Sequence, residues 1–137
     1  MERNTLMLDQ DHTKGTANEL YVASYFLEQG CQVYFPAVPQ GKTDLVVESN
    51  MDGSLCRVQV KTAFLNMSDG RGYVQCRTRT TNKQKTEPKD KYYDYLAIVD
   101  GREIWVIPAN EIASSNISLR STAFPEKPYG WDIYKRR

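Results

Sequence analysis

The alternation of apolar and polar residues predicts a β-hairpin in the first half of the chain. A β-branched run spans Thr43 to Glu48, and a second run spans Leu55 to Lys61. The residues between them, Asn50-Met51-Asp52-Gly53, are of the types that form turns. We therefore expect two antiparallel strands that meet at this turn.

The hairpin is expected to gather polar groups on one face. Because side chains alternate along a strand, Gln59 and Lys61 point to one side, whereas Val58 and Val60 point to the other. A turn centred near residues 51–52 or 52–53 places Asp44 opposite Gln59 or Lys61. Cross-strand neighbours lie ~5 Å apart at their Cβ atoms, so an acid, an amide and an amine are expected to meet.

Apolar residues at spacings of three and four predict an α-helix before the hairpin, from about Lys14 to Gln29, with Thr13 as its cap and Gly30 as its stop. Two adjacent rows form its apolar stripe: Thr16, Leu20, Ala23 and Leu27, and Gly15, Glu19, Val22 and Phe26. The polar face is assigned to Lys14, Asn18, Tyr21, Tyr25 and Glu28.

Glu19 is the unusual member of that stripe. A carboxylate on an apolar face is costly unless it is paired or binds a cation. We expect Glu19 to face the sheet that carries Asp44, as part of a functional site. The alternative is an edge position or a buried ion pair with Lys61.

The remaining pattern predicts a mixed sheet with helices against it, α/β or α+β, in one domain that spans residues 1–137. A polar, irregular lead-in is expected over residues 1–12, and an irregular chain from Ser114 as far as Trp131. Between them we expect strands at 31–38 and 72–79, an extension of the 55–61 strand through Leu65, a loop at 66–70, a hairpin of 92–99 and 103–107 around Asp100-Gly101, and a short helix after Pro108.

Composition excludes several classes of site. The chain has one histidine, which argues against a Ser-His-Asp triad or a multi-histidine zinc site. Its three cysteines are widely spaced in predicted strands and are expected to be small buried hydrophobes. No apolar run approaches the ~20 residues that span a bilayer, and no secretion signal is visible. We therefore expect a cytoplasmic protein without a membrane partner.

Basic residues are clustered although the net charge is only +1. The segment RGYVQCRTRTTNKQK contains no acid, and the end of the chain, 129–137, closes on the basic run IYKRR. Such clusters are typical of phosphate contact, although a solvated basic strand edge is the alternative. The candidate DNA contacts are Lys42, Arg71, Tyr73, Gln75, Arg77, Arg79, Lys83 and Lys85.

Oxygen-rich polar groups beside a lysine are suited to metal-assisted phosphodiester hydrolysis. Mg²⁺, or Mn²⁺ in its place, prefers oxygen ligands. Asp44 is the best ligand candidate, and Glu19 would complete the site, with the Gln59 side-chain oxygen or the Val60 carbonyl as neutral ligands. Lys61 would orient water or stabilise charge. No other small-molecule cofactor is expected.

The succession Glu19, Thr43-Asp44 and Gln59-Val60-Lys61 resembles the PD-(D/E)XK nuclease superfamily. Lys14-Gly15 with Glu19 is similar to the K-G-x-x-x-E start of its resolvase-like members. The Q-x-K motif and the block KYYDYLAIVDGREIWVIPANEI are similar to group I intron-encoded endonucleases of this superfamily, over about residues 13–112.

That resemblance implies a restriction-endonuclease-like mixed β-sheet of four to five strands flanked by helices. It also implies divalent-metal-dependent cleavage of double-stranded DNA, with Glu19, Asp44, Gln59 and Lys61 as the catalytic set. Thr43 replaces the usual proline, which is harmless. Gln59 replaces the second acid, which removes a charged ligand.

Three functions remain open at this point. The first is a site-specific homing endonuclease, and the second is a structure-selective nuclease such as a Holliday junction resolvase or a repair enzyme. The third is a DNA-binding protein that has lost catalysis. Cutting both strands at one place normally needs two active sites, so a nuclease of this size is expected to form a dimer or tetramer. A plain exposed sheet face with a cross-strand ion pair, worth ~0.2–1 kcal/mol, would leave Glu19 unexplained.

Overall fold

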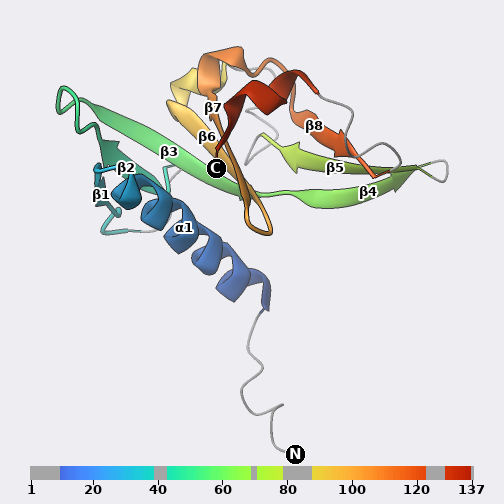
Figure 1. The fold of residues 1–137 in the computed structure, drawn as a ribbon, viewed down its shortest axis with the longest axis horizontal. Coiled ribbons are helices and arrows are strands. Elements are labelled where there is room, and N and C mark those ends of the chain that lie inside the picture. Colours follow the sequence, from blue (N-terminus) through green and yellow to red (C-terminus); the bar gives the residue numbers. More distant parts are fainter. Residues whose placement is uncertain (1–9, 39–42, 69–70, 79–87, 123–128, 137) are drawn as a thin grey trace, which may run out of the picture.

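A mixed six-stranded sheet, one α-helix and a second, three-stranded sheet make up the computed structural model (Figure 1). It describes residues 10–38, 43–68, 71–78, 88–122 and 129–136. The elements in chain order are α1 (Gln10–Glu28), β1 (Gln32–Tyr34), β2 (Leu45–Glu48), β3 (Leu55–Thr62), β4 (Phe64–Ser68), β5 (Arg71–Arg77), the 3₁₀ turn η3 (Lys89–Lys91), β6 (Tyr95–Asp100), β7 (Glu103–Pro108), η4 (Ala109–Glu111), β8 (Asn116–Ser121), η5 (Gly130–Tyr134) and β9 (Lys135–Arg136).

The larger sheet has the order β1-β2-β3-β6-β7-β9, and the smaller has the order β4-β5-β8. In the larger sheet β3 and β6 are parallel, and every other neighbouring pair is antiparallel. The predicted α/β class with a mixed sheet is confirmed, with six strands in place of the four or five that the resemblance implied. Strand β6 is buried through Leu96-Ala97-Ile98-Val99, as expected for a strand covered on both faces.

The two faces of the larger sheet are covered by different layers. Helix α1 packs on one face through Val22 and Ala23, which are 0% and 4% exposed. The smaller sheet covers the other face. Its core joins Val74 and Cys76 of β5 with Ile117 and Leu119 of β8, against Leu96, Ile98, Trp105 and Ile107 of the larger sheet.

The predicted first hairpin is confirmed. Leu45 pairs with Val58, and Glu48 pairs with Leu55. The turn between them closes with a hydrogen bond from the Ser49 amide to the Ser54 carbonyl, 2.8 Å long. Gly53 has a φ of +74° there, a conformation that favours glycine.

Helix α1 differs from the prediction at its start. It begins at Gln10, so Thr13 lies within the helix and is not its cap, and residues 10–12 are helical rather than irregular. Polar residues such as these disfavour a helix only weakly. The part of the expected lead-in before residue 10 lies outside the described residues.

The face that α1 turns to the sheet also differs in part. Leu20 and Leu27 are each 55% exposed, so their row reaches the core only at Ala23. Asn18 and Tyr25, expected on the polar face, lie toward the sheet instead. The row of Glu19, Val22 and Phe26 does face it. The helix is thus rotated by part of a turn from the predicted phase, because the row of Glu19, Val22 and Phe26 faces the sheet and the other row reaches it only at Ala23.

Two further expectations for the strands were wrong. Strand β3 does not run on to Leu65, because the chain leaves the larger sheet at Ala63 and enters the smaller one as β4. The expected loop at 66–70 is therefore strand as far as Ser68, and residues 69–70 lie outside the described part. The segment expected to be irregular contains β8, in which Ile117, Leu119 and Ser121 are buried in alternation.

The second predicted hairpin is confirmed. Asp100 pairs with Glu103 around Gly101-Arg102, and Gly101 has a φ of +61°. The short helix expected after Pro108 is also present, as η4. None of the helices in the described ranges is long and apolar enough to cross a membrane.

The cysteines vary in burial. All three are free, and only Cys76 is fully buried, where burial raises the pKa of its thiol to about 12. Cys31 precedes β1 instead of lying in a strand, and it is partly exposed like Cys56.

Candidate active site

Asp44 is the centre of a polar cluster at the start of β2. Its Oδ2 atom accepts hydrogen bonds from the Val60 backbone amide at 2.7 Å and from Gln59 Nε2 at 3.1 Å. The carboxyl group of Glu19, which comes from α1, also forms a hydrogen bond with Asp44. The structure thus brings together three of the four predicted catalytic side chains from three elements.

The strand ends explain why Asp44 takes this position. The ladder between β2 and β3 stops at Leu45 and Val58, whereas β3 continues to Thr62. The Val60 amide therefore lies beyond the last paired residue of β2, and the Asp44 side chain bonds to it in place of a strand. The Asp44 amide itself donates to the Val58 carbonyl at 2.9 Å, which holds the residue close to β3.

The two carboxyl groups strongly influence each other. Burial raises the pKa of Asp44, against the opposing effects of the Val60 amide, the Glu19 hydrogen bond and the Lys61 charge. Burial, and then the charge and hydrogen bond of Asp44, raise the pKa of Glu19. Two partly buried acids in contact repel each other when both are ionised. Such a pair is stabilised by a shared proton or by a bound cation.

Lys61 lies close enough to these acids to act on them. Its side chain is partly buried, and this burial lowers the pKa of Lys61. The Asp44 charge raises the pKa of Lys61, and the Arg77 charge lowers it. The predicted cation is therefore within electrostatic reach of the acid pair, and Arg77 of β5 adds a second positive charge to the same region.

The donor set fits a small divalent cation. Gln59 Oε1 is buried and accepts no hydrogen bond, although the Nε2 atom of the same amide is bonded to Asp44. A buried acceptor without a donor is costly, and a cation beside Asp44 would satisfy it. Within the described residues no three or more His, Cys, Asp and Glu side chains cluster as a metal site, so the neutral amide would have to complete the two acids.

Val60 contacts Asp44 through its backbone amide, whereas the sequence suggested its backbone carbonyl as a metal ligand. The amide orients the Asp44 carboxylate. Whether the carbonyl contributes a further ligand stays a prediction.

The candidate DNA contacts on β5 keep their predicted alternation. Tyr73, Gln75 and Arg77 point away from the core, whereas Val74 and Cys76 are 6% and 0% exposed. The remaining members of that set are only partly placed. Arg71 begins β5, but its side chain is not among those described, and Lys42, Arg79, Lys83 and Lys85 lie outside the described residues.

Gln75 is held in place from both sides by residues that the sequence reasoning missed. Asn66 Nδ2 of β4 donates to Gln75 Oε1 at 3.0 Å, and Gln75 Nε2 donates to Ser118 Oγ of β8 at 3.1 Å. The three side chains form a polar row across the outer face of the smaller sheet. The alternation of Ile117, Ser118 and Leu119 is the sequence signal that identifies β8 and its outward serine.

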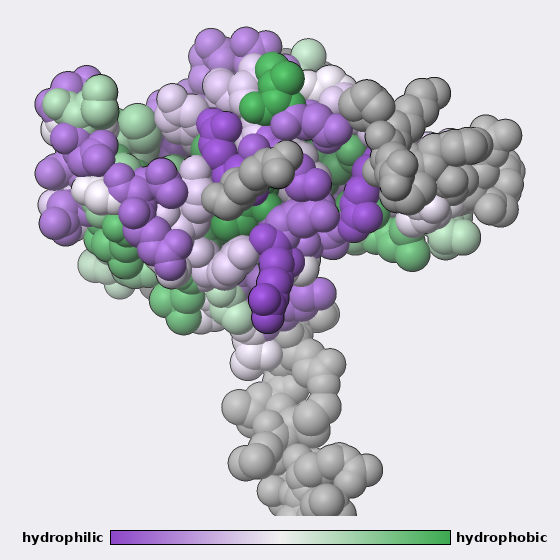
Figure 2. All heavy atoms as spheres, in the orientation of Figure 1, coloured by the Kyte–Doolittle hydropathy of each residue, from purple (hydrophilic) through white to green (hydrophobic). Residues whose placement is uncertain are grey.

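Two other surfaces offer little positive charge for binding DNA. In the basic C-terminal run, Lys135 Nζ lies 3.2 Å from Glu103 Oε2 and 5.4 Å from the Trp105 ring centroid, so an acid offsets its charge. Strand β4 exposes apolar side chains, with Leu65 57% and Met67 61% exposed. Figure 2 shows green, hydrophobic atoms at the lower right, where β4 lies in Figure 1.

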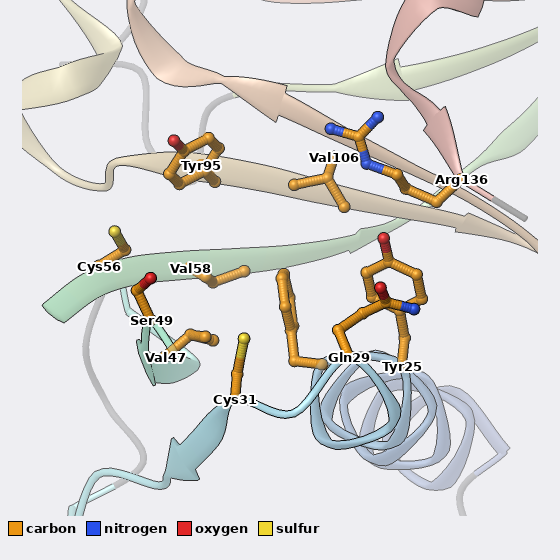
Figure 3. A pocket seen from close by; sticks show the side chains of 11 residues that line it. Tyr25, Gln29, Cys31, Val47, Ser49, Cys56, Val58, Tyr95, Val106 and Arg136 are labelled. Carbon is orange, nitrogen blue, oxygen red and sulfur yellow. The ribbon is translucent and has the colours of Figure 1, made fainter. Parts of the chain in front are cut away.

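An apolar pocket of about 280 Å³ lies beside α1, on the same face of the larger sheet (Figure 3). Figure 3 shows Tyr25 of α1 and Gln29, which directly follows that helix, on one side of it and Val58, Tyr95 and Val106 of the strands on the other. None of the candidate acids lines this pocket. It is therefore separate from the Asp44 cluster.

Comparison with known proteins identifies a matching family, a relative and a similar fold. Residues 9–128 match the family model of the PD-(D/E)XK endonuclease. Among curated proteins, the chain is 33% identical over 105 residues to Protein 5.3 of Escherichia phage T7. The matched region covers 77% of this chain and 86% of that protein. Among solved structures, the fold is similar to the bacterial homing endonuclease I-Ssp6803I, with a TM-score of 0.71, 20% identity, and coverage of 93% of this chain and 89% of that one.

Proposed function

The chain belongs to the PD-(D/E)XK endonuclease family, and we propose that it is a divalent-metal-dependent homing endonuclease that hydrolyses double-stranded DNA at specific sites. One observation carries the proposal. Asp44 is bonded to Gln59 and Glu19, while the buried Gln59 Oε1 has no donor of its own. A bound cation would satisfy all three groups at once.

Each side chain has a distinct role in this proposal. Asp44, Glu19 and the Gln59 oxygen hold Mg²⁺ or Mn²⁺, which supplies a Lewis acid for the phosphoryl oxygen and a more acidic water. The Val60 amide fixes the Asp44 carboxylate, so that the ligand does not have to reorganise. Lys61 stabilises the charge that develops on the scissile phosphate or aims the attacking water.

The outer face of the smaller sheet is the proposed DNA contact. Arg77 is exposed on β5, and its charge is close enough to Lys61 to lower the pKa of that lysine. Arg77 is therefore placed to contact a phosphate close to the scissile bond. Gln75 lies in the same strand and carries an amide, the group that pairs with adenine in the major groove. Each chain has one such site, so cleavage of both strands at one place requires at least a dimer.

A plasmid cleavage assay tests the proposal. We expect the wild type to nick and linearise supercoiled plasmid DNA that carries its site in Mg²⁺ or Mn²⁺ but not in EDTA. Asp44→Asn should abolish cutting, whereas the control Asp52→Asn, in the exposed β2–β3 turn, should cut normally. Binding without cutting in either metal would instead indicate a DNA-binding protein that has lost catalysis.

The choice of substrate tests the finer part of the proposal. A homing endonuclease should cut a few positions in a large duplex library. Preferential cutting of synthetic four-way junctions, at positions set by the branch and not by the sequence, would favour a junction resolvase.

A further inference from the structure

A hydrogen bond joins α1 to β3 beside the acid pair. Asn18 Nδ2 donates to Thr62 Oγ1 at 2.7 Å, between residues 44 apart in the sequence. Asn18 directly precedes Glu19, and Thr62 directly follows Lys61. The bond therefore connects the two backbone segments that carry the helix acid and the strand lysine.

Helix α1 has little other support at this point. Four described side chains before Asn18 are exposed: Thr13, Lys14, Thr16 and Ala17. The buried contacts to the sheet, Val22 and Ala23, come a full turn later. Figure 1 shows the N-terminal turns of α1 extending beyond the sheet. Helix turns with few buried side chains open readily.

Glu19 thus lies where the supported part of the helix begins. Its carboxyl group is in contact with that of Asp44, and when both groups are ionised their like charges push the helix away from the strand. A directional bond from the preceding residue opposes that displacement. It also fixes the rotation of α1 about its axis, which sets where Glu19 points.

We propose that Asn18 and Thr62 are positioning residues for the metal site. Their hydrogen bond keeps α1 against β3, so that Glu19 reaches the same cation as Asp44. The proposal rests on the proposed function, because it assigns these two residues a role toward the metal of that site. Neither residue touches substrate or metal; both act through Glu19.

Matched substitutions on both sides of the bond test this role. Thr62→Val removes the hydroxyl at nearly constant shape, whereas Thr62→Ser retains it. Asn18→Ala removes the donor. Tyr21→Phe is the control, because it deletes another bond from α1 to the sheet. The Tyr21 hydroxyl donates to the Arg102 carbonyl at 2.7 Å. Arg102 lies at the β6–β7 turn, so this bond does not join the segments that carry the acids.

Mn²⁺ affinity is measured by calorimetry without DNA, alongside kcat and thermal unfolding. Substitutions of groups that orient metal ligands typically cost 10–100-fold in affinity or activity. We expect Thr62→Val and Asn18→Ala to weaken Mn²⁺ binding about tenfold and to lower kcat similarly, with DNA affinity in EDTA unchanged. Thr62→Ser should retain wild-type values, and Tyr21→Phe should lower the unfolding temperature without changing Mn²⁺ affinity.

Two results would overturn the proposal. The first applies if the wild type binds Mn²⁺ and cuts DNA: Thr62→Val and Asn18→Ala both bind Mn²⁺ as tightly as the wild type does. The second is an equal loss of Mn²⁺ affinity in Tyr21→Phe, which would make the effect one of general helix docking. A wild type that neither binds Mn²⁺ nor cuts DNA would overturn the proposed function, and this role with it.

Discussion

Gln59 donates its amide to Asp44 at 3.1 Å, and the oxygen of the same amide is buried without a donor. Glutamine therefore does two things at once, of which a glutamate could do only the second. It adds a favourable bond to Asp44 instead of a third negative charge, and it still presents an oxygen to a cation. In the proposed metal site, the replacement of the second acid of the motif would keep a ligand while reducing repulsion.

Gln59→Glu tests this view through stability. The substitution removes the donor to Asp44 and places a third carboxylate in the cluster, so without metal the protein should lose about 1–3 kcal/mol of unfolding free energy. Mn²⁺ should raise its melting temperature by more than it raises that of the wild type. Urea unfolding in EDTA and melting curves with Mn²⁺ measure both effects. The control is Gln32→Glu, at an exposed position of β1. The prediction would be contradicted if Gln59→Glu lost no more unfolding free energy than the control and Mn²⁺ had no additional effect on its melting temperature.

Lys61→Met separates catalysis from binding. A group that stabilises charge acts chiefly in the transition state, whereas DNA affinity comes from many phosphate contacts. We expect kcat to fall by about 10²-fold or more, with DNA affinity in Ca²⁺ nearly unchanged. Gel shifts in Ca²⁺ and cleavage rates in Mg²⁺ measure the two quantities. Lys91→Met, on the exposed turn η3, is the control, and an equal loss of affinity and rate would make Lys61 a docking residue.

Local sequence signals were sufficient for the central part of the site. The hairpin follows from β-branched runs around a turn that needs a positive φ at Gly53, and both signals lie within 20 residues of each other. The convergence of Asp44 with Gln59 follows from strand alternation. The orientation of Glu19 toward the sheet was predicted correctly, because its row also contains Val22.

Other features depend on contacts that no local pattern encodes. Leu20 and Leu27 extend an apolar row as convincing as that of Val22, and only the shape of the sheet decides that this row is buried at Ala23 alone. Asn18 was assigned to the polar face because its partner, Thr62, is 44 residues away. Strand β8 was missed although Ile117 and Leu119 alternate with polar residues, because two apolar positions are a short signal and the partner strand β5 is distant in the sequence.

Asp94 gives a prediction for acid stability. The hydrogen bond from the Arg57 side chain, with the Arg57 amide donating to Asp94 Oδ2 at 2.7 Å, holds the pKa of Asp94 below its usual range. A carboxyl with a lowered pKa in the folded state stabilises the protein above its unfolded value of ~3.9, and the contribution is lost as the pH falls through the folded pKa. Because the Asp94 side chain is 39% exposed, we expect only about 1 kcal/mol.

Asp94→Asn should therefore be less stable than the wild type near neutral pH, and the two should converge as the pH falls through the folded pKa of Asp94. Urea unfolding at several pH values measures the difference. Asp132→Asn, on the exposed turn η5, is the control. A difference between Asp94→Asn and the wild type that stays constant from pH 7 to pH 3 would show that the lost packing, and not the charge, is responsible.

Gln75 and Arg77 are expected to differ in how they contact DNA. Gln75 is held by Asn66 and Ser118, so its amide is already oriented before binding, as direct reading of a base requires. We expect Gln75→Ala to cost ~1–3 kcal/mol on the preferred site and to relax selectivity at one position. Arg77 lies near Lys61, where a phosphate contact is expected. Arg77→Ala should weaken binding equally on all sequences and reduce the salt dependence of affinity by about one ion.

Binding titrations of both variants on matched and substituted duplexes, at several salt concentrations, distinguish these two modes. Asn66→Ala adds a sharper test, because it should reproduce part of the selectivity change of Gln75→Ala by freeing the Gln75 amide. If replacing Gln75 and Arg77 together leaves affinity, selectivity and salt dependence unchanged, β5 is not part of the DNA interface. The basic C-terminal segment would then be the surface to test, beginning with Arg136, because Lys135 is already paired with Glu103.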